Sequence, residues 1–160
     1  MTLNYLSEYA EDVLLALALA KKEAEHLSYT QRTLFAQPID LDWVESLPDQ
    51  PAQAEKIDAY VARFGRLQDH IGEKLIPRFA RLMGENPKSL LDALAFAEKM
   101  EWIDNAEEFI GARKLRMLVH EYVEETELFL QSLQTADAAT NLLLDVVIRI
   151  SKQAEKLKLR

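Results

Sequence analysis

Two short stretches of the sequence share the spacing R-x-x-R-x-x-x-H, and both carry residues suited to phosphate chemistry. They are formed by Arg63, Arg66 and His70, and by Arg113, Arg116 and His120. In a helix this spacing places the three side chains on one face. Arginine makes bidentate contacts with phosphate, and histidine transfers a proton near neutral pH. Either set could bind a phosphodiester and support general acid–base cleavage, with the arginines stabilising the developing negative charge.

The first stretch lies in a segment whose apolar residues recur at helical spacing on the other side. That apolar face comprises Ile57, Tyr60, Val61, Phe64, Leu67, Ile71 and Leu75. Asp69 and Glu73 lie among the polar residues of the same segment. We therefore expect Arg63, Arg66 and His70 to occupy a solvated helix face, with a binding site as the alternative.

The second stretch differs because apolar residues border it on both sides. The expected core-facing side comprises Leu115, Leu118, Val119, Tyr122, Phe129 and Leu133, and a second apolar line comprises Ile110, Met117 and Leu128. Arg113, Arg116 and His120 lie between these two lines, together with Glu124 and Glu127. This pattern is consistent with a site at the rim of an interface, including one with a second copy of the chain, although the spacing alone favours an ordinary solvated surface.

Metal chemistry has weaker support in the sequence. A carboxylate-bridged di-metal bundle needs two Glu-x-x-His pairs, and the sequence has only Glu23 with His26. No H-E-x-x-H, Walker or G-x-S-x-G motif is present. A weak cluster of His120 with Glu121, Glu124 and Glu125 is the remaining alternative. We expect no metal and no cofactor.

The composition predicts one helical domain that spans residues 1–160. The chain has 49% apolar residues, 29% charged residues, only 4 Gly and 5 Pro, and no Cys. The net charge of −8 argues against a general nucleic-acid or membrane binder, so any RNA contact must come from a local patch. The apolar run Val13–Ala20 is too short to span a bilayer, and Glu11 and Asp12 precede it, unlike a signal peptide. We expect a cytoplasmic protein.

The periodicity predicts an all-α, up-and-down bundle of four to five helices. Helices are expected over 3–36, 52–83, 85–100, 104 to about 133, and 136–158, with a loop at about 37–51. Asn86 with Pro87 is expected to begin the third helix, and Asp104 with Glu107 the fourth.

Several residues add expectations about how these helices pack. Leu14, Leu15 and Leu19 widen the apolar face of the first helix, which predicts burial on several sides. Pro77 predicts a kink in the second helix, because its ring clashes with the carbonyl four residues earlier. Gly65 and Gly72, seven residues apart, predict the close approach of another helix.

The segment "VHEY", with arginine just upstream on a late helix, resembles the HEPN family. More specifically, it looks like the branch that accompanies minimal nucleotidyltransferases, including nucleotidyltransferase substrate-binding proteins. The resemblance covers roughly residues 60–122, through "ARFGRLQDHIGEKLIPRFARLMGE", "LLDALAFAEKMEWIDNAEEF" and "ARKLRMLVHEY". It implies a helical bundle that dimerises, with an R-x4-6-H motif lining a cleft between protomers. Many members are metal-independent ribonuclease toxins, and others are inactive binding partners.

The resemblance assigns roles to particular residues. His120 corresponds to the motif histidine, and Tyr122 to the tyrosine that a partner nucleotidyltransferase modifies with AMP in some toxin pairs. Arg113 leaves six residues before His120 and meets the R-x4-6-H rule, whereas Arg116 leaves three. Arg116 resembles the family arginine after a one-residue deletion, which would turn the helix by about 100°. Met117 replaces the polar residue that usually follows.

Three functional hypotheses follow. The first is a HEPN-type dimeric module that binds, or is regulated by, a separate minimal nucleotidyltransferase in a toxin–antitoxin-like pair. The second is a metal-independent endoribonuclease toxin that acts on RNA through Arg113, Arg116 and His120. The third is a catalytically inert helical interaction domain. The expected partners are a second copy of the chain, the nucleotidyltransferase, and RNA or a nucleotide.

The expected homodimer brings the predicted fourth helices of two chains together through the line of Ile110, Met117 and Leu128. His120 would then face the cleft between them, and Glu124 would lie among the positive charges.

Overall fold

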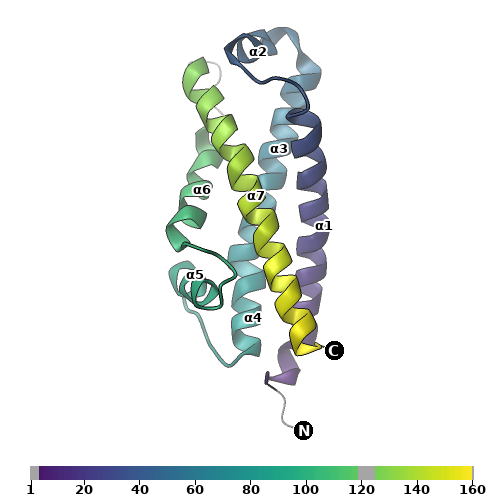
Figure 1. Ribbon diagram of the computed structural model, residues 1–160, viewed down its shortest axis with the longest axis vertical. Helices are drawn as coiled ribbons and strands as arrows, with labels where there is room; N and C mark the ends of the chain where they lie inside the picture. The colour runs from purple at the N-terminus through teal and green to yellow at the C-terminus, as the bar shows by residue number, and fades with distance from the viewer. Residues whose placement is uncertain (1–3, 119–124, 160) are drawn as a thin grey trace.

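The computed structural model describes residues 4–118 and 125–159, and these residues form helices and turns without a strand. The elements are η1 (Ser7–Tyr9), α1 (Ala10–Leu34), α2 (Leu41–Ser46), η2 (Leu47–Asp49), α3 (Pro51–His70), η3 (Ile71–Leu75), α4 (Ile76–Leu82), α5 (Leu90–Lys99), α6 (Ala106–Leu118) and α7 (Thr126–Leu157). Figure 1 shows α1, α3 with α4, and α7 running along the long axis. Helices α5 and α6 cover one side, and α2 lies at one end. The prediction of an all-helical bundle is confirmed.

Helix α1 forms where the sequence has neither glycine nor proline, and it buries one side. Val13, Ala16, Ala20 and Leu27 recur at helical spacing and face the core. The expectation that α1 is buried on several sides is wrong, because Leu15 is 60% exposed and Leu14 and Leu19 are also exposed. Figure 1 shows the reason: α1 lies at the edge of the bundle, with its neighbours on the inner side.

The second predicted helix runs from Pro51 to Leu82 but changes its winding before Pro77. Pro77 has no N–H to donate, and its ring would clash with the carbonyl of Glu73 in a regular α-helix. The chain adopts a π-helical turn over Ile71–Leu75, in which the N–H of Ile76 donates to the carbonyl of Ile71. This wider turn accommodates the proline, so the expected disturbance takes the form of a π-bulge.

Helix α5 begins later than the sequence predicts. Its N-cap is Ser89, whose hydroxyl oxygen accepts a hydrogen bond of 3.1 Å from the N–H of Asp92. The carboxylate of Asp92 accepts a hydrogen bond of 3.1 Å from the N–H of Lys88. The expected start at Asn86 and Pro87 is therefore wrong, because this reciprocal capping pair fixes the first turn three residues later.

Helix α6 begins next to Asn105 instead of the predicted Asp104. The side-chain oxygen of Asn105 accepts a hydrogen bond of 2.7 Å from the N–H of Glu107. Asp104 lies 2.8 Å from Nη1 of Arg149 on α7, and this hydrogen bond lowers the pKa of the Asp104 carboxyl. Asp104 therefore connects the start of α6 to α7 and does not cap the helix.

The last two helices also divide at a different place from the predicted one. Helix α6 ends at Leu118, and α7 runs without interruption from Thr126 to Leu157. Residues 134–135, the expected junction, lie inside α7, where the sequence has no helix-breaking residue. The predicted loop at about 37–51 contains α2, which Asp40 caps by accepting a hydrogen bond of 2.8 Å from the N–H of Trp43.

A buried polar pair connects α3 to α7 inside the apolar core. The Thr140 hydroxyl donates to the carbonyl of Ala136, four residues earlier on α7, at 2.8 Å. Its single hydrogen is used there, so the Tyr60 hydroxyl is the donor in the 2.5 Å hydrogen bond to Thr140. Burial raises the pKa of Tyr60 above its ordinary value of 10.0.

We predict that the stability of the fold depends on this phenol in a pH-dependent way. Removing the hydroxyl in Tyr60→Phe should cost about 1 kcal/mol of unfolding free energy near neutral pH. Tyr60 in the unfolded chain loses its proton near pH 10, whereas the buried phenol keeps its proton to higher pH. Its contribution is therefore complete below that pH and is lost as the pH rises above it.

Urea unfolding of the wild type and Tyr60→Phe between pH 7 and pH 11 measures this contribution. Above pH 10 the wild type should lose about 1.4 kcal/mol per pH unit more than the variant. Tyr29→Phe is the control. Tyr29 is exposed, so removing its hydroxyl should leave the pH dependence of the unfolding free energy the same as in the wild type. Parallel profiles for Tyr60→Phe and the wild type would contradict the assignment.

Candidate functional site

The structure does not bring the first R-x-x-R-x-x-x-H stretch together as one site. Nη1 of Arg63 donates to the Thr30 hydroxyl oxygen at 2.5 Å and to the carbonyl of His26 at 3.2 Å, both on α1. His70 is 7% exposed, and its Nε2 lies 2.7 Å from the carbonyl of Ala16. The predicted solvated face is therefore wrong for His70, because α1 covers this side of α3. Arg66 is exposed, as expected.

Arg116 in the second stretch is held by an ion pair with α3. Its Nη1 lies 2.6 Å from Oδ1 of Asp69, and the two side chains are 32% and 36% exposed. The guanidinium group crosses α3 at Gly65, where an added Cβ would lie 2.7 Å from Nε of Arg116. Only a residue without a side chain leaves Arg116 room to reach Asp69 in this geometry.

Side chains of α5 and α6 fill the space over the two glycines, where the sequence predicts the close approach of another helix. Arg116 from α6 occupies the space at Gly65. At Gly72, an added Cβ would lie 3.0 Å from Leu90 of α5 and 3.4 Å from Phe109 of α6. The glycine pair therefore marks the side of α3 and η3 that contacts side chains of α5 and α6.

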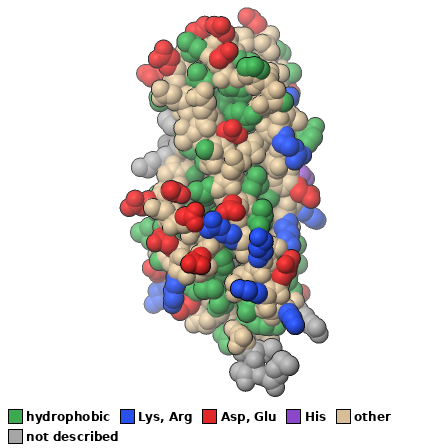
Figure 2. All heavy atoms as spheres, in the orientation of Figure 1, with side chains coloured by type: hydrophobic (Ala, Val, Ile, Leu, Met, Phe, Trp, Pro, Cys, Tyr) green, Lys and Arg blue, Asp and Glu red, His purple; other side chains and the backbone are tan. Residues whose placement is uncertain are grey.

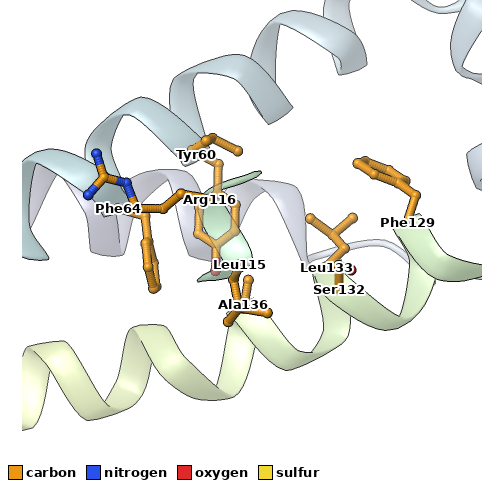
Figure 3. A pocket seen from close by; sticks show the side chains of 9 residues that line it. Tyr60, Phe64, Leu115, Arg116, Phe129, Ser132, Leu133 and Ala136 are labelled. Atoms are coloured by element: carbon orange, nitrogen blue, oxygen red, sulfur yellow. The ribbon is translucent and has the colours of Figure 1, made fainter. Parts of the chain in front are cut away.

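A small pocket lies between α3, α6 and α7 beside this ion pair. Its volume is about 20 Å³, and it is lined by Tyr60, Val61, Phe64, Leu115, Arg116, Phe129, Ser132, Leu133 and Ala136. Figure 3 shows the side chain of Arg116 extending from the pocket toward α3. The aliphatic part of Arg116 thus lines an apolar hollow while its charged end reaches the surface. The pocket has room for about one water molecule and not for a nucleotide.

The remaining residues of the second stretch are described only in part. Arg113 is exposed on α6. His120, Tyr122 and Glu124 lie outside the described residues, as does the side chain of Met117. The candidate catalytic set is therefore represented by Arg113, which faces solvent, and Arg116, which is paired with Asp69.

The apolar line that is expected to join two copies of the chain contributes in part to the core of a single chain. Ile110 is partly buried and packs against the core, and Leu128 at the start of α7 is 36% exposed. Ile110 is therefore not a spare apolar side chain, which weakens the argument for an interface at this place.

Asp69 is the residue of this site that sequence reasoning missed. The sequence pattern places Asp69 among the solvated residues, whereas in the structure it holds the candidate catalytic Arg116. Gly65, four residues earlier on the same helix face, is the signal that could have identified it, because a helical glycine indicates that something approaches closely.

Metal binding and membrane insertion have no structural support within residues 4–118 and 125–159. No group of three or more His, Cys, Asp or Glu side chains gathers there in a way that could hold a metal ion. In the same part of the chain, every helix is too short or too polar to cross a bilayer.

We predict that Gly65 and Gly111 respond in opposite ways to the same substitution. Gly111 on α6 has open space around an added Cβ, so Gly111→Ala should stabilise the fold by about 0.5–1 kcal/mol through helix propensity. Gly65→Ala makes the same gain but must displace the Arg116 guanidinium. Loss of this partly exposed ion pair costs up to about 1 kcal/mol, so the net effect of Gly65→Ala should be near zero or destabilising.

Denaturant unfolding in a double-mutant cycle tests the cause. Asp69→Asn should destabilise the wild type but have little further effect in the Gly65→Ala background. Equal stabilisation by the two glycine substitutions, with an unchanged effect of Asp69→Asn, would show that Arg116 does not depend on Gly65.

Comparison with known proteins does not assign a function to this site. No protein-family model matches the chain, and no curated protein or solved structure is significantly similar to it. The functional conclusion therefore depends on the residues themselves and on the resemblance seen over residues 60–122.

Proposed function

We propose that the chain is a HEPN-type helical module that acts by binding a separate minimal nucleotidyltransferase rather than by cutting RNA. The observation that carries this proposal is the ion pair between Arg116 and Asp69. An arginine that must hold a phosphate needs its donors free, whereas here a carboxylate already accepts from Nη1 at 2.6 Å. RNA would have to compete with Asp69 for this guanidinium group, and the Asp69 carboxylate would repel a phosphate placed beside it.

The charge distribution supports the same choice. Figure 2 shows acidic side chains over α5 and α6 with Lys and Arg side chains near them, and further acidic groups at the end of the bundle near α2. RNA affinity comes largely from neutralising phosphates with Lys and Arg, so the acidic side chains over α6 and the net charge of −8 disfavour this ligand. A protein partner with basic groups fits this side better.

The identity of the partner draws on the resemblance of residues 60–122. In that branch of the family, a minimal nucleotidyltransferase accompanies the helical protein and in some pairs transfers AMP to the tyrosine of the H-x-Y motif. The corresponding residue here is Tyr122. Its hydroxyl oxygen would attack the α-phosphorus of ATP, forming a phosphodiester with AMP and releasing pyrophosphate and a proton.

We predict that the chain forms a stable complex with a minimal nucleotidyltransferase encoded beside it. The two proteins, co-expressed with a tag on one, should co-purify, and ATP with Mg²⁺ should add one adenylate to the chain by intact mass. Tyr122→Phe is expected to lose the adenylate while keeping the complex. Failure of the untagged protein to co-purify would remove the proposed partner.

The ribonuclease alternative retains one supporting observation, which is that Arg113 is exposed and lies on the same helix as Arg116. Under our proposal, expression of the chain alone and of His120→Ala should affect growth equally. The purified protein should leave RNA intact in the presence of EDTA. Growth arrest by the wild type that His120→Ala relieves would instead establish the metal-independent nuclease.

A further inference from the structure

The outer face of α1 is apolar at its centre and has no covering element within the described chain. Leu15 is 60% exposed, Leu19 44% and Leu14 36%, although an eight-residue apolar run contains all three. Figure 1 places α1 at the edge of the bundle, on the other side from α5 and α6. A helix that is apolar all round is usually buried all round, so this face has the composition of an interface.

The residues along this face follow the spacing of a helix-pairing seam. Glu11, Leu15, Ala18 and Lys22 are separated by four, three and four residues, and all four are exposed. This alternation keeps side chains on one line of the helix, as in the seam of a coiled coil. The order along the seam is acidic, apolar and then basic.

This order is complementary to itself when the second helix runs in the opposite direction. We propose that the outer face of α1 is the docking surface for α1 of a second copy of this chain, packed antiparallel about a two-fold axis. Glu11 then faces Lys22 of the second copy, and Leu15 faces Ala18 and Leu19 of the second copy. The same two contacts occur twice, because a two-fold interface repeats every pair.

The charges favour a second copy of α1 as the partner, and they favour the antiparallel direction. A parallel pair would place Glu11 against Glu11 of the second copy and Lys22 against Lys22 of the second copy, which is repulsive at both ends. In the antiparallel pair, both charge contacts are attractive and enclose the apolar centre, where the small side chain of Ala18 permits close approach. Glu11 and Lys22 lie at equal distances from the centre of the seam and carry opposite charges. This symmetry suits a second copy of the same helix, whereas an unrelated partner would not require it.

The size of the surface indicates a weak dimer. One pair of helices in contact over about three turns lies at the low end of specific interfaces, so the association should depend on concentration in the micromolar range. The surface is separate from Arg113 and Arg116 on α6. The inference therefore does not rest on the proposed nucleotidyltransferase partner.

Sedimentation equilibrium of the full chain over a range of concentrations tests the apolar centre. Leu15→Glu should weaken the wild-type dimer roughly tenfold or more, because it buries a carboxylate beside Ala18 and Leu19 of the second copy. Leu91→Glu is the matched control: Leu91 is 63% exposed on α5, away from the proposed surface, and its substitution should leave the association unchanged. Circular dichroism checks that each variant is folded.

A charge exchange tests the direction. Glu11→Lys alone and Lys22→Glu alone each place like charges together twice, so each purified variant should be monomeric where the wild type is dimeric. An equimolar mixture of the two variants should associate again, because every contact is then attractive. A monomeric wild type, a Leu15→Glu dimer as strong as the wild type, or a mixture that stays monomeric would each overturn the proposal.

Discussion

The arrangement of the bundle depends on α3, which makes a different polar contact with each of three neighbouring helices. Arg63 and His70 bind carbonyl and hydroxyl oxygens of α1. Tyr60 donates to Thr140 of α7, and Asp69 holds Arg116 of α6. Apolar contacts alone would permit neighbouring helices to slide or rotate, whereas these directional contacts fix the register of each one. The surface features of α1 and α6 follow from this central constraint.

The use of Arg116 in packing changes the meaning of the arginine–histidine pattern. A guanidinium group that crosses a glycine and reaches a carboxylate on the next helix contributes to the position of α6. The same group is then unsuited to a task that requires it to bind a phosphate and release it. Arg63 gives a parallel case, since its Nη1 is occupied by two oxygens of α1. Arg63 and Arg116, one from each copy of the repeated spacing, therefore each attach α3 to a neighbouring helix.

The helices were predictable from the sequence, but the contacts between them were not. Apolar periodicity reports which side of a helix is buried, so most of α1, α3 and α7 could be located. Capping is a competition among nearby polar residues, and it selected Ser89 over Asn86 and Asn105 over Asp104. The ion pair between Asp69 and Arg116 joins residues 47 positions apart, a relation that local spacing does not contain. The leucines on the outer side of α1 differ most from expectation, because the sequence predicts that they are buried and no helix of the bundle covers them.

The positions of the two surfaces limit how they can work together. Helices α1 and α6 lie on opposite edges of the bundle (Figure 1), so a pair of chains joined through α1 holds their two α6 helices apart. A cleft that combines arginines from both chains requires the opposite arrangement, with the two α6 helices in contact. An α1-joined pair would instead present two separate and equivalent α6 surfaces to its surroundings. Such a pair can bind two partner molecules at once, and a partner that is itself dimeric would gain from the effective concentration that its first contact creates. Pairing through α1 therefore fits a binding module better than a shared catalytic cleft.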